Sequence, residues 1–327
     1  MERIRFGIVG LGRIAEKFAQ AFSESAGLPH AELTAVAATD PARAEAFAAR
    51  FGVPHALESY DALLASREVD VVYVAVTNNA HFEVCMRVIR AGKHLLCEKP
   101  MAMRYEEAAR IVAAAKKKGV FAMEAMWPRF LPASQRLQDW LRQGAIGRLQ
   151  LADITVSGYR SQETYWRLFC PELGGGALFD LGVYGVEALL DYVGVDAQIA
   201  EVSAFTMKNE RQVDWMANAG IRFTNGAAGL VKCSITASMD NISYLYGEKG
   251  YIRIGPTVNH PEEVALFAGP RGGGERLVEQ FCHAVGNGME FQIEHVARCI
   301  AEGKRDSGRM PLSDTLKCAR IFDAALG

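Results

Sequence analysis

The sequence predicts two folded parts: a doubly wound α/β domain over residues 1–126 and an α+β domain with a large, mostly antiparallel open sheet over residues 127–327. Three observations predict them. The length of 327 residues exceeds what one hydrophobic core usually serves. Up to about residue 125, short apolar runs alternate with amphipathic stretches, as in a parallel sheet wound with helices. Beyond it, strand-like segments follow one another with few helices between them.

Five apolar runs in the first part predict buried parallel strands, and we expect a sixth, short strand near His55. Helix signals lie between them. Asp40-Pro41 has the pattern of an N-cap followed by proline, and Gly52 and Gly92 stand where helices should end. The five runs cover residues 4–9, 33–38, 69–76, 94–97 and 120–125.

The second part shows alternating strands and then two closing helices. Gly247 and Gly250 mark the turn of a hairpin between residues 243–246 and 251–254. The helices are expected over 289–301 and 312–325, and we allow for the last one packing on the first domain. The other predicted strands are 149–157, 201–207, 220–224 and 227–236.

The composition favours a small molecule as the binding partner over nucleic acid or a membrane. The net charge is only −2 and both signs are interleaved, so no strong field would attract nucleic acid or anionic lipid. No apolar run approaches the roughly 20 residues of a membrane helix, and no signal-peptide layout opens the chain. The seven cysteines are scattered singly, without metal-site spacing, so we expect no metal and a reducing, cytoplasmic location.

The segment after the first predicted strand has the spacing of a dinucleotide-binding loop. Gly10 suits the tight turn, Gly12 lets the backbone approach a pyrophosphate, and Ala15 permits close helix packing. An ordinary strand-to-helix turn also uses glycine, but the position before a helix favours a Rossmann domain binding NAD or NADP. The loop residues assigned to the cofactor are Gly10, Gly12, Arg13, Ile14 and Ala15.

Thr39, Asp40 and Arg43 follow the second strand, where such folds contact the adenosine ribose. An Asp40 carboxylate would accept hydrogen bonds from the ribose hydroxyls and repel a 2′-phosphate, which favours NAD. The same residue, placed before Pro41, is also a good helix cap, and Arg43 lies near enough to neutralise a phosphate. The sequence therefore assigns all three residues to the cofactor and leaves NAD against NADP open.

Two further cofactor segments follow later strands of the same domain. Thr77, Asn78 and His81 lie after the fourth strand, at the edge where ligands bind in open α/β sheets. His81 has an equally good alternative role, satisfying a local backbone group. Glu98 and Lys99 end the fifth strand, where Lys99 would face the nicotinamide as an acid or base; a plain surface lysine is the alternative.

Asp180 and Tyr184 follow a glycine-rich segment, residues 174–176, at the start of a predicted long helix. Four residues apart, they lie on one helical face and can point at one substrate. The alternative is a pair of partnered polar groups at a domain interface.

These motifs, taken in order, resemble the Gfo/Idh/MocA oxidoreductase family over nearly the whole chain. Within it, residues 124–132 are similar to the branch of dimeric dihydrodiol dehydrogenases and NADP-linked sugar dehydrogenases. The resemblance implies that Lys99 and Tyr184 form the proton-transfer pair and that subunits pair through the open sheet as a homodimer or larger assembly. The residues it implies for the substrate pocket are Trp127, Arg129, Phe130, Asp180 and Tyr184.

Two positions depart from the family pattern. Thr77 replaces a usual proline, and Thr39 stands where NADP-using relatives often carry arginine. The expected reaction is hydride transfer between the nicotinamide and a carbinol carbon of a sugar, polyol or cyclic trans-diol. Two alternatives are a dinucleotide-retaining hydrolase or lyase that uses transient oxidation, and a non-enzymatic dinucleotide sensor. A sensor would have no reason to keep Lys99 and Tyr184 together.

Overall fold

The computed structural model describes residues 3–24 and 28–327, and the chain forms two compact units. Unit 1 is Met1–Trp127 with Gly286–Leu312, and unit 2 is Pro128–Val285 with Ser313–Gly327. The predicted division at residue 127 placed residues 286–312 in the second domain, whereas they belong to unit 1. The helical pattern of this segment shows that one face is buried but does not say which sheet it covers.

Unit 1 is built on a six-stranded, fully parallel sheet with the order β3-β2-β1-β4-β5-β6, which confirms the doubly wound prediction. The strand order reverses between β1 and β4, and in open α/β sheets such a switch point is where ligands bind, at the carboxyl ends of the strands. The strands are β1 Ile4–Val9, β2 Ala31–Ala37, β3 His55–Leu57, β4 Val71–Val74, β5 His94–Glu98 and β6 Ala122–Ala125.

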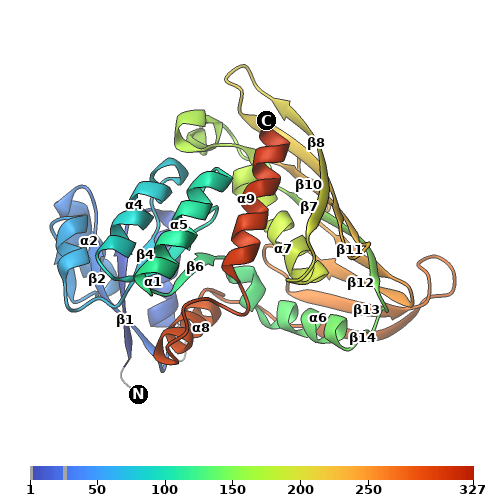
Figure 1. The fold of residues 1–327 in the computed structure, drawn as a ribbon, viewed down its shortest axis with the longest axis horizontal. Helices are drawn as coiled ribbons and strands as arrows, with labels where there is room; N and C mark the ends of the chain where they lie inside the picture. The colour runs from blue at the N-terminus through green and yellow to red at the C-terminus, as the bar shows by residue number, and fades with distance from the viewer. Residues whose placement is uncertain (1–2, 25–27) are drawn as a thin grey trace. The chain divides into compact units, whose positions relative to one another are not determined.

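Helices on both sides of this sheet bury apolar faces against it (Figure 1). Phe18 of α1 stacks on Tyr73 of β4, with ring centroids 3.8 Å apart. The late helix α8 packs against α1, β1 and β2. The helices are α1 Arg13–Glu24, α2 Pro41–Phe51, α3 Tyr60–Ala65, α4 Asn78–Arg90, α5 Tyr105–Lys118 and α8 Glu290–Ala301.

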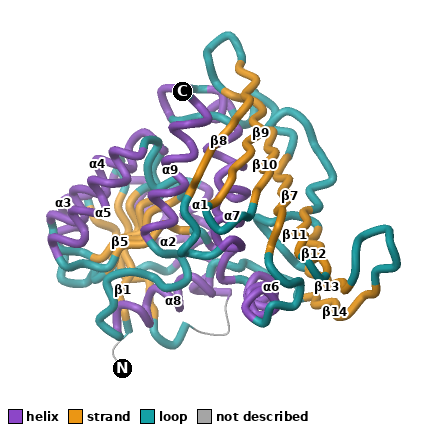
Figure 2. Tube along the Cα trace, turned by 45° about the vertical axis from the view of Figure 1, so that its right-hand side comes forward, coloured by secondary structure: helices purple, strands orange, loops and turns teal. Residues whose placement is uncertain are grey.

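Unit 2 contains an eight-stranded sheet with the order β14-β13-β12-β11-β7-β10-β9-β8 (Figure 2). Only the β7–β10 pair is parallel, which confirms the mostly antiparallel prediction. The last two strands were not predicted, because β14 lies at an edge and lacks a buried alternating face. The strands are β7 Leu149–Ser157, β8 Ile199–Lys208, β9 Asp214–Phe223, β10 Ala228–Ser234, β11 Ser243–Gly247, β12 Gly250–Gly255, β13 Glu263–Ala268 and β14 Arg276–Cys282.

One face of this sheet carries α6 and α7, and among the described residues no element is drawn on the other face (Figure 1). The final helix α9 belongs to unit 2 from Ser313 onward, so it does not extend the first unit. The helical elements are the 3-10 turns η1 Trp127–Phe130, η2 Trp166–Phe169 and η3 Pro171–Leu173, the π-helical turn η4 Leu178–Gly182, and the α-helices α6 Pro132–Arg142, α7 Val183–Val193 and α9 Leu312–Leu326.

One stretch corrects the expectation that no segment has the length and apolar character of a membrane helix. Pro171–Val193 meets both criteria, but 83% of its most apolar window is buried inside the protein. The core helix of a soluble protein has the same properties, so this stretch is weak support for a membrane span.

Candidate active site

The glycine loop of unit 1 joins β1 to α1 and fits a pyrophosphate. Gly10 has φ +89°, and a Cβ there would lie 2.7 Å from the carbonyl oxygen of Ala75, so only glycine fits the turn. At exposed Gly12 a Cβ would meet nothing within 4 Å, which leaves the backbone at the start of α1 open to an anion. Ala15 is fully buried, as close helix packing requires. Between them, Arg13 is exposed and Ile14 is half-buried.

At the end of β2 both an anion and a cation are available to an adenosine ribose. Asp40 caps α2, accepting a hydrogen bond from the N–H of Ala42 at 3.0 Å, and Thr39 beside it is exposed. Arg43 donates from Nη2 to the carbonyl oxygen of Leu11 at 3.1 Å, which places its guanidinium beside the glycine loop. These contacts do not choose between NAD and NADP.

The polar turn after β4 is tied to the turn after β5 by His81. Its Nδ1 lies 2.8 Å from the carbonyl oxygen of Pro100, its Nε2 lies 3.2 Å from that of Val76, and the side chain is fully buried. This geometry favours the local backbone role over direct cofactor contact. Thr77, the N-cap residue of α4, and Asn78 are half-buried and remain the better placed of the three to meet a cofactor.

Lys99 extends from the carboxyl end of β5 next to a buried carboxyl group. Tyr73 donates to Glu98 Oε1 at 2.5 Å, and the N–H of Lys99 donates to Glu98 Oε2 at 3.2 Å. Burial raises the pKa of Glu98, while the Tyr73 hydrogen bond and the Lys99 ammonium oppose that rise. Glu98 therefore orients the segment that carries Lys99, and the Lys99 side chain is half-buried.

Two charged residues that the sequence analysis did not single out lie in the same region of unit 1. Glu124 of β6 is buried and accepts a hydrogen bond from the N–H of Met101 at 3.0 Å. Lys17 of α1 places its Nζ 4.0 Å from the ring centroid of Trp127; burial lowers its pKa, opposed by Glu290 and Glu98. Glu124 could have been found from the sequence, because a glutamate within an otherwise apolar strand is rarely buried without a partner.

In unit 2, glycines in and after the glycine-rich segment allow close packing against neighbouring chain. A Cβ at Gly175 would lie 2.5 Å from the carbonyl oxygen of Leu168, and one at Gly182 would lie 2.8 Å from Cys233 Sγ on β10. Gly185 is similarly close to β10, since a Cβ there would lie 2.7 Å from Val231 Cγ1. The glycines therefore let the helix lie tightly on the sheet.

Asp180 and Tyr184 lie on the opposite side of this helix from the sheet. Each is two residues from Gly182, roughly 200° around the axis, and both are half-buried. The structure corrects one expectation: residues 178–182 form a π-helical turn before the α-helix begins at Val183. The two side chains still share a face, and such π-turns are frequent at functional sites.

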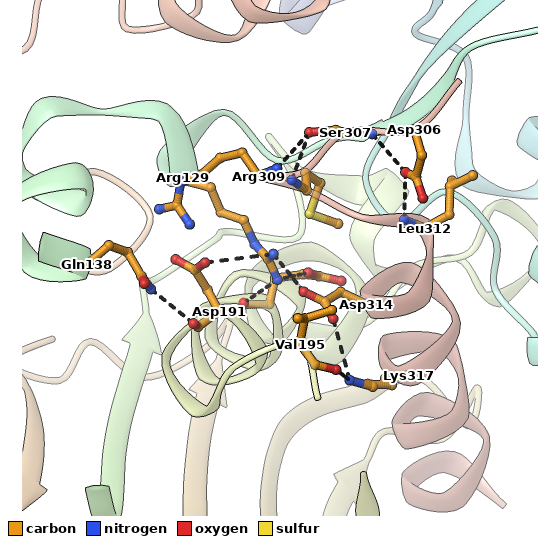
Figure 3. A network of polar contacts seen from close by, with 12 residues as sticks. Arg129, Gln138, Asp191, Val195, Asp306, Ser307, Arg309, Leu312, Asp314 and Lys317 are labelled. Atoms are coloured by element: carbon orange, nitrogen blue, oxygen red, sulfur yellow. Dashed lines mark hydrogen bonds and ion pairs between the residues drawn. The ribbon is translucent and has the colours of Figure 1, made fainter. Parts of the chain in front are cut away.

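Arg129, which the family resemblance assigns to the substrate pocket, has its guanidinium engaged within unit 2. Its guanidinium donates to Glu187 Oε2 at 2.6 Å and to Asp314 Oδ2 at 2.8 Å, and Asp191 lies 3.9 Å away (Figure 3). Burial alone would lower its pKa, but the three carboxylates raise it. Arg129, Glu187 and Asp314 are all buried, so Arg129 ties η1 to α7 and α9. Phe130 beside it is also buried.

The site residues thus divide between the units, with Lys99 and Trp127 in unit 1 and Asp180 and Tyr184 in unit 2. Among residues 3–24 and 28–327, no cluster of three His, Cys, Asp or Glu side chains is placed to hold a metal ion.

Comparison with known proteins identifies relatives along the whole chain. Residues 4–126 match the profile described as "Oxidoreductase family, NAD-binding Rossmann fold", and residues 134–253 match the GFO/IDH/MocA C-terminal domain. A trans-1,2-dihydrobenzene-1,2-diol dehydrogenase of Mus musculus is 33% identical over 98% of this chain and 96% of its own length. The enzyme of the same name from Xenopus laevis is 32% identical over 98% and 97%.

Solved structures show the same fold. KijD10, a 3-ketoreductase from Actinomadura kijaniata in complex with NADP and TDP-benzene, has a TM-score of 0.84 at 27% identity, covering 99% of this chain and 97% of that one. The aldose-aldose oxidoreductase of Caulobacter crescentus, complexed with glycerol, has a TM-score of 0.85 at 27% identity, covering 99% and 98%. With its glycine loop, Lys99 segment and paired profiles all in place, the chain belongs to the Gfo/Idh/MocA family of NAD(P)-dependent oxidoreductases.

Proposed function

We propose that this protein is a dehydrogenase that transfers hydride between a nicotinamide dinucleotide and a carbinol carbon of a sugar, polyol or cyclic trans-diol. The observation that carries the proposal is Lys99 at the carboxyl edge of the dinucleotide-binding sheet, next to buried Glu98. The names of the relatives support the substrate class, since they describe a dihydrodiol dehydrogenase and an aldose oxidoreductase.

Three tasks fall to the chain's own residues: binding the dinucleotide, orienting the substrate and transferring the hydroxyl proton. Residues of the glycine loop and Thr77 would hold the dinucleotide, which supplies the hydride acceptor or donor when bound. Lys99 and Tyr184 share the transfer of the hydroxyl proton, and an ammonium near a phenol would make the two titrate as a coupled pair. Asp180, on the same helix face as Tyr184, would orient the substrate hydroxyls.

The test is turnover of a panel of sugars, polyols and cyclic diols, followed by nicotinamide absorbance in the wild type, K99M and K118M. Lys118 is an exposed lysine in the last turn of α5 and serves as the matched control. K99M should lose about 10²–10⁴-fold in kcat, as expected for a proton-transfer group, while its dinucleotide affinity stays close to that of the wild type.

Full hydride transfer by K99M would refute the assignment. Substrate cleavage without net change in absorbance would indicate the hydrolase or lyase alternative, and dinucleotide binding without turnover of any compound would indicate the sensor.

We also propose a cytoplasmic homodimer. All seven cysteines are free, five of them buried, which suits a reducing compartment. The uncovered face of the unit 2 sheet exposes large apolar side chains, notably Phe205 on β8 and Leu230 on β10. A second copy of this chain would cover that face.

A further inference from the structure

Asp214, the first residue of β9, lies buried against the start of the helix that carries Asp180 and Tyr184. Only 3% of the residue is exposed, and its Oδ2 accepts a hydrogen bond from the N–H of Leu178 at 2.8 Å. The backbone N–H of Ala177 also acts on this carboxyl group and lowers its pKa. These N–H groups belong to the first turn of the helical segment, where no intrahelical acceptor exists for them. A carboxylate there also interacts favourably with the helix dipole.

The chain around Asp214 is shaped to admit the carboxyl group. Gly176, immediately before the bonded amides, has φ +132°, and a Cβ added to it would overlap Asp214 Oδ1. The glycine therefore allows the carboxylate to approach the backbone directly. Farther along the helix, Gly182 and Gly185 lie against Cys233 and Val231 of β10. The helix is thus held at its start by Asp214 and along its length by the sheet.

We propose that Asp214 is a positioning residue for the reaction: by fixing the backbone of Ala177 and Leu178, it sets where Asp180 and Tyr184 point. The inference rests on the proposed function, because the two side chains matter only if they meet the substrate. Asp214 is 3% exposed, so it would act through the backbone of the helix start rather than by direct contact with a ligand. A displacement of about 1 Å at a reacting group can cost about 10²-fold in rate, so the loss of this anchor should appear in catalysis.

The charged and titratable surroundings of Asp214 are few. Lys208 pairs with it across β8 and β9 and lowers its pKa, while the thiol of Cys233 faces it from β10. Burial is the largest influence and raises the pKa of Asp214 to about 6, against the lowering effect of the backbone N–H groups of Leu178, Asp214 and Ala177. The carboxyl group therefore changes charge within the range in which enzyme activity is measured.

The experiment compares the wild type, D214N and E279Q. Asn keeps the shape of Asp but not its charge. Glu279 on β14 pairs with Arg136 of α6 in the same unit, so E279Q removes another carboxylate that is remote from this helix. Three quantities are measured for each: the Kd for NAD and NADP, kcat and KM between pH 5 and 8 with a substrate accepted by the wild type, and hydrogen exchange of peptides spanning 174–182.

We expect D214N to bind dinucleotide as the wild type does, to lose about tenfold or more in kcat/KM at pH 7.5, and to exchange faster at 177–182. The fall of wild-type kcat/KM below about pH 6 should be absent from D214N. E279Q should match the wild type in both kinetics and exchange of this segment.

Equal exchange of residues 177–182 in the wild type and D214N overturns the inference whether or not a substrate is found, and so does a wild-type kcat/KM in D214N. Failure of the wild type to turn over any compound would count against the proposed function alone, since the exchange comparison still decides whether Asp214 holds the helix start.

Discussion

Burial is the main influence on the pKa values of two carboxyl groups near the candidate site, those of Glu98 and Asp214. Glu98 and Asp214 both have raised pKa values because they are buried, although each accepts hydrogen bonds that favour its charged form. Exposed Asp40 lies at the other extreme, capping a helix in full contact with solvent. The same residue type therefore serves as a helix cap or as a buried anchor according to its surroundings.

Asp214 should make the stability of the protein depend on pH. Its folded pKa of about 6 exceeds the ordinary value of 3.8, so the native state binds the proton more tightly than the unfolded state. The free energy of unfolding should therefore fall as pH rises from about 4 to 6, by up to about 3 kcal/mol from this group. Urea unfolding of the wild type and D214N across this range tests it. A constant difference between the two proteins would contradict the prediction.

Arg43 is expected to discriminate between NADP and NAD. Its guanidinium lies beside the glycine loop through its bond to Leu11, where a 2′-phosphate would gain a charge-assisted hydrogen bond. R43A should weaken NADP binding about tenfold more than NAD binding, which calorimetric titration with each nucleotide would measure. Arg50, exposed in the last turn of the same helix, provides R50A as control. Equal weakening for both nucleotides would remove Arg43 from the adenosine site.

At the scale of elements, the helix bearing Asp180 and Tyr184 shows how glycines can serve packing. Gly182 and Gly185 bring the π-turn and α7 close to β10, and Gly176 admits Asp214. Arg129 adds a second constraint, because its ion pairs join η1 to α7 and α9. Removing one partner from such a buried network leaves an uncompensated charge and is strongly destabilising.

A pair of alanine substitutions separates backbone strain from contact in this element. Gly176 and Gly194 both have positive φ, +132° and +91°, so alanine costs roughly 1–3 kcal/mol of strain at either position. Only at Gly176 would the Cβ also overlap Asp214; at Gly194 it would meet nothing within 4 Å. G176A should therefore lower the Tm and kcat/KM more than G194A does. Similar effects of both variants would indicate that Asp214 is not pressed against the chain.

At the scale of the whole molecule, the open sheet face of unit 2 is the surface on which the proposed homodimer rests. Phe205 and Leu230 are 56% and 45% exposed, and the strand pairing places both on the face opposite the buried residues Ala219 and Val231. Apolar side chains this exposed on a broad sheet are typical of a subunit interface.

The homodimer proposal predicts that charge on this face separates the subunits. Sedimentation at micromolar concentration should show a dimer for the wild type and a monomer for F205E/L230E, because two carboxylates per subunit would be desolvated in the interface. V195E is the control, since Val195 is 51% exposed but lies outside the strands. A monomeric wild type, or a double variant that still dimerises, would contradict the proposal.

The sequence alone predicted both fold classes and the motif residues, because strand periodicity, glycine spacing and the Lys99 segment are local patterns. His81, Arg129 and Glu124 show its limit. A histidine after a strand, an arginine near a tryptophan and a glutamate in an apolar run have the same local pattern whether they meet a ligand or a carbonyl group.

Only the tertiary structure decided which partner each residue has. It placed residues 286–312 in unit 1, locked Arg129 among three carboxylates, and brought Asp214 to the start of a helix that begins more than thirty residues earlier. The physical reason is that burial and long-range contact set the energies of these groups, and neither is encoded in spacing along the chain.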